Sequence, residues 1–251
     1  MQNSEVSMRF ILATGFWLLD SHTDIAKVKK PFNPLLYLVT DPDLSLGRPE
    51  EEIVWRAVSA GVTMVQYRDK DTSTKRMIEK TRLLVDICQP AGVALIVNDR
   101  LDVALAGGAD GVHLGQDDMD PGDCRSIAGM EFIIGVSVTT IEEVKSAENA
   151  GADYLGANGV FPTGTKTDLG EPLGIEGVSR LASAASLPIV AIGGIKDTNA
   201  GEVIAAGADG VAVVSYIVGA ENIEGRCRTL VQVLRDKKIG VKEENSPKPK
   251  A

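Results

Sequence analysis

Polar and cationic side chains alternate directly after one short apolar segment of the chain. The segment is Val62–Val65, and the side chains are those of Gln66, Arg68 and Lys70. Residues two apart share one face of an extended strand, so these three would point the same way if the strand continues that far. Arginine binds phosphate oxygens through a planar fork, and lysine binds them as a point charge. The spacing therefore predicts an anion site at the end of this strand.

Carboxylates follow two neighbouring apolar segments and predict a site for a divalent cation. Asp99 comes after the first segment, and Asp117 and Asp118 come after the second. Two carboxylates with water and phosphate oxygens are a common environment for Mg²⁺. Spacing alone does not choose between Asp117 and Asp118, and Asp99 has the alternative role of a helix cap. A metal ion beside three cations, with Lys166 as the third, would suit a diphosphate better than a monophosphate.

A second anion site is predicted farther along the chain. Gly193-Gly194 and Val214-Ser215 follow the last two apolar segments, where barrel enzymes often hold a phosphate on backbone N–H groups. Glycines there also suit a tight turn, so this signal is weak by itself. His113 is expected to be a packed residue, and no serine, histidine and cysteine arrangement supports acyl transfer. Two anion sites in one cavity indicate transfer of a group between two phosphorylated substrates.

A short phrase that joins helical to apolar segments recurs along the chain. It reads Ala60-Gly61, Ala91-Gly92, Gly107-Gly108, Ala150-Gly151 and Ala206-Gly207. A glycine at the end of a helix can take the left-handed conformation that terminates the helix. Each phrase therefore predicts the joint between a helix and the next strand of a repeating βα unit.

The segments between these joints predict eight strands. They are Leu35–Val39, Met64–Tyr67, Ala94–Asn98, Gly111–Leu114, Phe132–Ser137, Tyr154–Val160, Ile189–Ile192 and Val211–Ser215. Continuous apolar runs are typical of parallel strands that are buried on both faces. Eight βα units in 251 residues predict an α/β fold, a single (β/α)8 TIM barrel with chemistry at the C-terminal ends of its strands. A doubly wound sheet is disfavoured because no G-x-G-x-x-G follows the first strand.

The two ends of the chain are expected to lie outside the barrel. Residues 1–33 are expected to form an extension with a helix in the apolar run Phe10–Leu19, which lacks the charge pattern and cleavage site of a signal peptide. The barrel is expected over 34–237. Residues 238–251 have few apolar side chains to bury and are expected to be a disordered polar tail.

Composition limits the classes of partner. The formal net charge is −9, so affinity for nucleic acid or for an anionic membrane is not expected. Cys88, Cys124 and Cys227 lack the spacing of metal ligands and are expected to be free thiols in a reducing compartment, which indicates the cytoplasm. Small molecules are the expected partners, and the sequence leaves a homo-oligomer open.

Seven groups of residues, in order, resemble the thiamine-phosphate synthase family over roughly residues 35 to 235. The matching motifs are Val65-Gln66-Tyr67-Arg68-Asp69-Lys70, Val97-Asn98-Asp99, His113-Leu114-Gly115-Gln116-Asp117-Asp118, Gly135-Val136-Ser137, Phe161-Pro162-Thr163-Gly164-Thr165-Lys166, Ile192-Gly193-Gly194-Ile195 and Val214-Ser215. The resemblance implies a Mg²⁺-dependent transferase of thiamine biosynthesis. It would join 4-amino-2-methyl-5-hydroxymethylpyrimidine diphosphate to a thiazole monophosphate and release diphosphate.

The resemblance also implies a role for each matching residue. The pyrimidine diphosphate would be held by Gln66, Tyr67, Arg68, Asp69, Lys70, Asn98, Ser137 and Lys166, and the thiazole phosphate by Thr163, Gly164, Thr165, Gly194, Val214 and Ser215. Arg68, Lys70, Lys166 and Ser137 would take part in catalysis. Asp99 and Asp118 would bind Mg²⁺, which selects Asp118 over Asp117.

The chain departs from the family pattern in two places, at the turn Asn158-Gly159 and in the stretch Gly164–Gly170. Asn158-Gly159 stands where the family usually has Gly-Pro, beside the expected thiazole site. The stretch Gly164–Gly170 is expected to act as a lid.

Two other functions remain as alternatives. A thiazole tautomerase of the same barrel group would need the second anion site but not the metal and diphosphate site. A barrel that only binds a phosphate ligand would not need these grouped charges.

Overall fold

Eight parallel strands form a closed barrel in a computed structural model that describes residues 31–163 and 171–244. The strands are β1 (Leu36–Val39), β2 (Met64–Tyr67), β3 (Ala94–Asn98), β4 (Gly111–Leu114), β5 (Ile133–Val138), β6 (Tyr154–Asn158), β7 (Ile189–Ile192) and β8 (Gly210–Val213). Each strand pairs with the next along the chain, and β8 pairs with β1. The predicted TIM barrel is confirmed.

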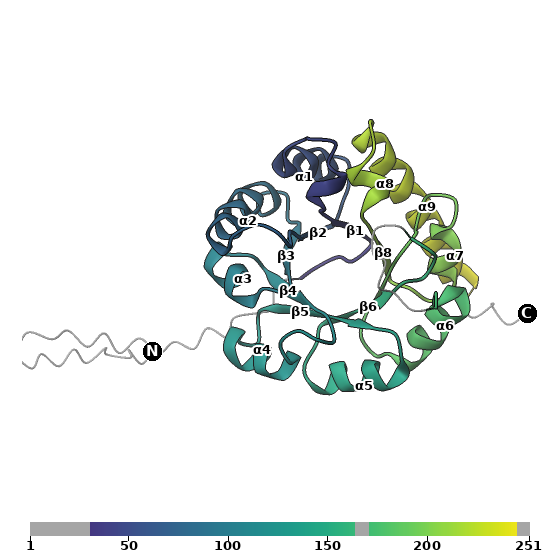
Figure 1. Cartoon of the computed structure of the whole chain (residues 1–251). Helices are drawn as coiled ribbons and strands as arrows, with labels where there is room; N and C mark the ends of the chain where they lie inside the picture. Colours follow the sequence, from purple (N-terminus) through teal and green to yellow (C-terminus); the bar gives the residue numbers. More distant parts are fainter. Residues whose placement is uncertain (1–30, 164–170, 245–251) are drawn as a thin grey trace, which may run out of the picture.

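Helices surround the barrel as an outer ring (Figure 1). They are α1 (Glu50–Ser59), α2 (Thr74–Cys88), α3 (Leu101–Gly107), α4 (Pro121–Ala128), α5 (Ile141–Asn149), α6 (Gly174–Ala184), α7 (Ala200–Ala205), α8 (Ser215–Val218) and α9 (Ile223–Glu244), with a short 3-10 helix at Pro42–Leu44. The second residue of each joint phrase, from Gly61 to Gly207, has a positive φ. The left-handed conformation predicted at these helix ends is therefore present.

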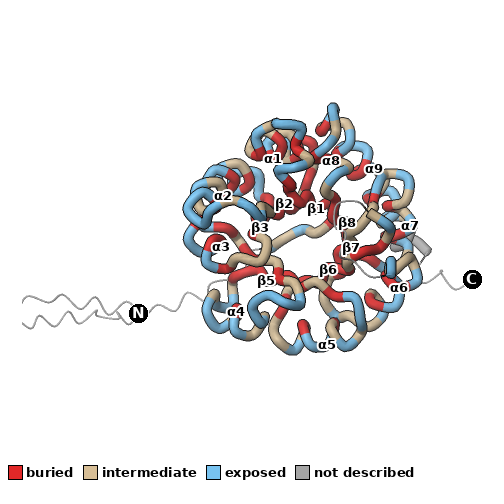
Figure 2. The backbone as a smooth tube through the Cα atoms, viewed as in Figure 1, coloured by how far each residue is buried: buried red, intermediate tan, exposed pale blue. Residues whose placement is uncertain are grey.

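Strand residues alternate between two apolar layers. Along β1, Leu36 and Leu38 pack outward in the layer under the helices, while Tyr37 and Val39 belong to a separate cluster inside the barrel. The strands are buried on both faces, whereas the helices turn exposed faces to solvent (Figure 2). Burial on both faces explains why the strand sequences are continuous apolar runs instead of alternating ones.

Several element ends differ from the prediction. β6 stops at Asn158 instead of Val160, and β8 stops at Val213, so Ser215 begins helix α8 instead of ending a strand. At the C-terminus, α9 continues to Glu244. Residues 238–244, expected to belong to a disordered tail, are therefore helical. Lysine and glutamate are good helix formers, and no Gly or Pro stops the helix between 241 and 244. Residues 1–30 and 245–251 lie outside the described residues.

The cysteines agree with a further expectation. Cys88, Cys124 and Cys227 form no disulfide, as the sequence predicts, and all three are buried. Within residues 31–163 and 171–244, no helix has the length and apolar character needed to cross a membrane.

Glycines inside the barrel make room for large rings, which leads to a prediction on stability. A methyl group added at Gly135 on β5 would lie 2.1 Å from Cζ of Tyr154. Overpacking of this kind usually costs about 1–3 kcal/mol, so we expect Gly135→Ala to lower the free energy of unfolding by at least that amount. In Gly201→Ala the nearest atom would be 3.9 Å away, and the helix α7 favours alanine. Urea unfolding of both variants tests this, and equal stabilities would contradict it.

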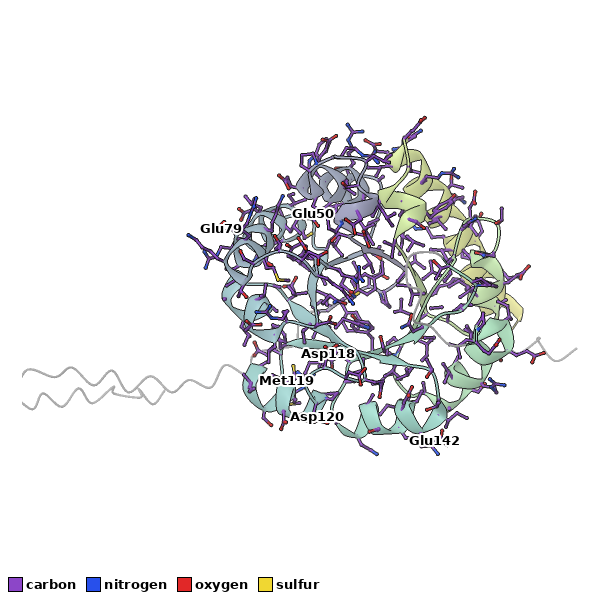
Figure 3. All side chains as sticks on the ribbon, viewed as in Figure 1. Glu50, Glu79, Asp118, Met119, Asp120 and Glu142 are labelled. Atoms are coloured by element: carbon purple, nitrogen blue, oxygen red, sulfur yellow. The ribbon has the colours of Figure 1, made fainter. Side chains whose placement is uncertain are left out.

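A buried carboxyl group at the start of α1 gives the fold a pH dependence. Glu50, labelled in Figure 3, is buried, and its Oε1 atom has no hydrogen-bond partner among the described residues. Burial raises the pKa of Glu50 from 4.5 to about 7, against the opposing charge of Lys80. A raised pKa means that the folded protein holds this proton more tightly than the unfolded chain does. The stability from this group is therefore present below pH 4.5 and is lost as the pH rises to about 7.

Glu50→Gln should remove this dependence. Glutamine carries no charge at any of these pH values, so we expect a flatter unfolding free energy between pH 4.5 and 7, with a gain of up to about 3 kcal/mol at higher pH. Chemical denaturation across this pH range is the measurement. Glu51→Gln is the control, because Glu51 is barely buried and its pKa is lowered by a hydrogen bond from Lys80. An unchanged slope in Glu50→Gln would show that Glu50 is not the source.

Candidate active site

A cavity of about 530 Å³ lies at the C-terminal ends of the strands and receives residues from around the whole barrel. The predicted residues that line it are Gln66, Arg68, Lys70, Asn98, Asp99, Asp118, Ser137, Thr163, Gly194, Val214 and Ser215. Residues Gly164, Thr165 and Lys166, and the expected lid to which they belong, lie outside the described residues. The fold therefore gathers side chains that are far apart in the sequence at one opening.

The cations after β2 line the cavity, as the alternating pattern predicts, although β2 itself ends at Tyr67. The loop after β1 positions Arg68. Oδ2 of Asp41 accepts a hydrogen bond from Nη1 of Arg68 at 3.1 Å, and Oγ1 of Thr40 accepts one from its backbone N at 3.0 Å. Asp41 is itself nearly buried. Arg68 is thus held at one wall of the cavity instead of moving freely in solvent.

Tyr67 and Asp69, which the family resemblance places at the substrate, do not line the cavity. Tyr67 points outward from β2 and packs in the apolar layer under the helices. Oδ1 of Asp69 accepts hydrogen bonds from the backbone N atoms of Asp71 and Thr72, both at 3.1 Å. The reason is alternation, because the neighbours of inward-facing Gln66 and Arg68 must face the other way.

Two carboxylates from different loops meet at the cavity. A hydrogen bond links the side chains of Asp99 and Asp118, and burial together with the Asp118 charge raises the pKa of Asp99 to about 6, despite nearby Lys70. Oδ2 of Asp118 accepts a hydrogen bond from the backbone N of Gly115 at 2.6 Å. Asp118 lies nearer the barrel centre than Met119 and Asp120, which lie toward α4 (Figure 3). Asp117 also lines the cavity.

The backbone at Asp99 is strained, which is consistent with a functional position. Its φ is 61°, and among the described residues only Leu46 shares a positive φ without being glycine. Such a conformation costs about 1–3 kcal/mol and persists where the surroundings impose it. The backbone N of Asp99 donates to the carbonyl oxygen of His113 at 2.8 Å, which fixes the turn. Asp99 is not the cap of α3, since Arg100 occupies that place.

The paired carboxylates fit a divalent cation. The Asp118 charge raises the energy of the charged form of Asp99, and a bound cation would remove this repulsion. In residues 31–163 and 171–244, no three His, Cys, Asp or Glu side chains converge as a complete metal site. Mg²⁺ commonly takes one or two protein carboxylates and completes its shell with water and substrate phosphates, so an incomplete protein shell suits this ion.

A row of hydrogen-bonded side chains crosses the interior of the barrel below these charges. It runs from Gln66 through Tyr37, Tyr154 and His113 to Ser137. Each of the five lines the cavity. The sequence predicts Gln66 and Ser137, but it gives no role to Tyr37 or Tyr154 and expects His113 only to pack. Side chains alternate between the two faces of β1 and β6, so the sequence indicates that Tyr37 and Tyr154 each share a face with every second residue. Which of the two faces points into the barrel depends on the strand register.

Backbone turns form the opposite side of the cavity. Gly193 and Gly194 have φ values of 115° and 63°, and a methyl group at Gly194 would lie 2.8 Å from the carbonyl oxygen of Pro162. Glycine is therefore required there for the conformation and for the close approach of the backbone. Gly159, in the departing turn, has a φ of 77° and donates its backbone N–H to the carbonyl oxygen of Ile192 at 2.9 Å. Lys196 is a further cation that lines the cavity.

The fold and the site together define a (β/α)8-barrel enzyme with cations and a carboxylate pair at its mouth. The sequence profile of the thiamine monophosphate synthase family matches residues 36–217. The chain belongs to this family. It is an enzyme, a transferase of thiamine biosynthesis that acts on small molecules.

Individual proteins support this assignment. The chain is 47% identical over 207 residues to thiamine-phosphate synthase from Chloroflexus aurantiacus, covering 81% of this chain and 95% of that protein. It is 45% identical over 199 residues to the Moorella thermoacetica enzyme of the same name, covering 79% and 95%. Thiamine phosphate pyrophosphorylase from Pyrococcus furiosus has a similar solved structure, with a TM-score of 0.75, 40% identity and coverage of 81% and 96%.

Proposed function

We propose that this enzyme joins 4-amino-2-methyl-5-hydroxymethylpyrimidine diphosphate to thiazole monophosphate and releases diphosphate, which gives thiamine phosphate. The observation that carries the proposal is the meeting of Arg68 and Lys70 with the Asp99–Asp118 pair in one cavity. Cations beside a carboxylate pair suit a diphosphate that is bound together with Mg²⁺. A site for thiazole phosphate alone has no need of this combination.

The charged residues would stabilise the departing diphosphate. Negative charge grows on this group as its bond to the pyrimidine methylene breaks, and preorganised cations stabilise that charge. Arg68 is already fixed by Asp41, so little reorganisation is needed. Asp99 and Asp118 would hold Mg²⁺, which neutralises phosphate charge when it is bound. Lys166 would assist on the family resemblance alone, because it lies outside the described residues.

The second substrate would occupy the other side of the cavity. Gly194, Val214 and Ser215 line this side and would hold the thiazole phosphate through backbone and hydroxyl hydrogen bonds. The thiazole nitrogen then needs only to be held in line with the methylene carbon. No general base is needed, since the nitrogen attacks through its lone pair and carries no proton to be removed.

Product analysis tests this proposal. The protein should form thiamine phosphate when both substrates and Mg²⁺ are present and none when any one of the three is left out. Isomerisation of thiazole phosphate without use of the pyrimidine diphosphate would instead favour a tautomerase. Binding of thiazole phosphate with no turnover of either compound would favour a barrel that only binds its ligand.

A further inference from the structure

Four hydrogen bonds join five side chains in a continuous row across the barrel interior. Nε2 of Gln66 donates to the Tyr37 hydroxyl at 2.8 Å, and the hydroxyls of Tyr37 and Tyr154 are 2.9 Å apart. The Tyr154 hydroxyl is 3.0 Å from Nδ1 of His113, and Nε2 of His113 is 3.0 Å from Oγ of Ser137. The row therefore connects the amide of β2 to the serine of β5.

Counting protons gives the row a direction. Burial raises the pKa of both Tyr37 and Tyr154, so each phenol stays neutral and has one proton to donate. The Tyr37 oxygen accepts from the Gln66 amide, and its own proton then goes to Tyr154. The Tyr154 proton goes to Nδ1 of His113. In the reverse order the Tyr37 proton would face the donating Gln66 amide and have no acceptor within the row, and buried donors that lack an acceptor are costly.

The direction of donation fixes which nitrogen of His113 carries the proton and whether Ser137 donates or accepts. Since Nδ1 of His113 accepts, a neutral ring must carry its proton on Nε2 and donate it to Oγ of Ser137. The Ser137 proton is then not used within the row and is available to the cavity, which Ser137 lines. In the opposite direction, Ser137 would give its proton to His113 and could only accept from a ligand.

Close packing holds the two central rings in place. A methyl group at Gly156 would lie 3.0 Å from Cε1 of His113, and one at Gly135 would lie 2.1 Å from Cζ of Tyr154. The rings of His113 and Tyr154 also contact each other, with centroids 5.5 Å apart. The bare backbone of two neighbouring strands therefore fixes the ring positions on which the hydrogen-bond order depends.

We infer that His113 is a positioning residue that holds Ser137 as a hydrogen-bond donor toward an acceptor atom of the aromatic substrate. Because each hydrogen bond in the row fixes the donor of the next, the orientation of the Gln66 amide determines, through two phenols and one imidazole, that the Ser137 hydroxyl donates to the cavity. The identity of that substrate as the pyrimidine diphosphate rests on the proposed function. The proton position on His113 does not, because it is a property of the protein without substrate.

Nitrogen NMR of the full chain tests the proton position. The sequence has two histidines, His22 and His113, so ¹⁵N-histidine labelling gives two rings, and His22→Gln assigns them. At about pH 8, above the ordinary histidine pKa of about 6.5, couplings to the ring carbon-bound protons should show His113 protonated on Nε2 and not on Nδ1. A proton on Nδ1, or an equal mixture, would overturn the inference even if the enzyme makes thiamine phosphate.

Removal of the Tyr154 hydroxyl tests the positioning role of His113. Tyr154→Phe removes the donor to Nδ1, so we expect the His113 ring to lose its single tautomer and the Kd for the pyrimidine diphosphate to rise about tenfold, the value of one hydrogen bond. Thr81→Val is the control, because it removes a buried hydroxyl that bonds to the carbonyl oxygen of Met77 outside the row and the cavity, and it should change neither quantity. Unchanged affinity in Tyr154→Phe would overturn the positioning role while leaving synthase activity intact. If that variant does not fold, the wild-type tautomer still decides the inference.

Discussion

Asp99→Asn or Asp118→Asn is expected to abolish Mg²⁺-dependent formation of thiamine phosphate while the barrel stays folded. Each change removes one of the two carboxylates that meet at the cavity, and an amide is a weaker ligand for a hard cation. Folding should be preserved, because the exchange relieves repulsion between the pair. Turnover measured against Mg²⁺ concentration, together with thermal unfolding, checks both parts.

Asp117→Asn provides the matched control for the carboxylate pair. Asp117 also lines the cavity, but the pKa of Asp99 is raised by burial and then by the hydrogen bond and the charge of Asp118, not of Asp117. We therefore expect a much milder loss in Asp117→Asn. Equal losses at 117 and 118 would show that the choice of ligand is wrong.

Arg68→Ala is expected to slow thiamine phosphate formation by about 100–1,000-fold, the usual cost of one preorganised electrostatic contact with a transition state. The interaction grows as charge develops on the leaving diphosphate, so it acts on the rate more than on binding. Affinity for thiazole phosphate should change little, because that substrate is expected on the side of Gly194 and Ser215. Single-turnover rates and thiazole phosphate binding, measured on the same variant, separate the two effects.

Arg56→Ala serves as the control for charge removal. Arg56 pairs with Glu52 on α1 and does not line the cavity, so its loss should leave the rate unchanged. We expect Lys166→Ala to behave like Arg68→Ala on the family resemblance. Full activity in Arg68→Ala would remove the electrostatic part of the proposal.

Local signals in the sequence predict most of the fold. A helix often ends at a glycine because glycine readily takes the left-handed conformation that terminates it. This preference marks the joints from Gly61 to Gly207. Four strands, β2, β3, β4 and β7, have the predicted bounds. The end of β6 is misplaced because Gly159 and Val160 stay buried beyond the last paired residue, and the end of β8 because the apolar run continues into the half-buried Val214 before the exposed Ser215.

The site is predicted less completely, because its remaining parts depend on contacts between distant segments. Asp41 bonds to Arg68 across the β1–β2 pair, and Tyr37 meets Tyr154 across the barrel interior. Neither pairing has a local sequence signal. Tyr67 shows the converse, since it lies in a matching motif but faces outward under the helices. Side-chain direction follows from register, which one sequence does not supply.

The most direct test of the proposed reaction is a single turnover with the enzyme in excess over both substrates and Mg²⁺ present. Thiamine phosphate and diphosphate should appear together, one of each for every pyrimidine diphosphate consumed. A thiazole phosphate that changes while the pyrimidine diphosphate remains intact, or no change in either substrate, would contradict the account.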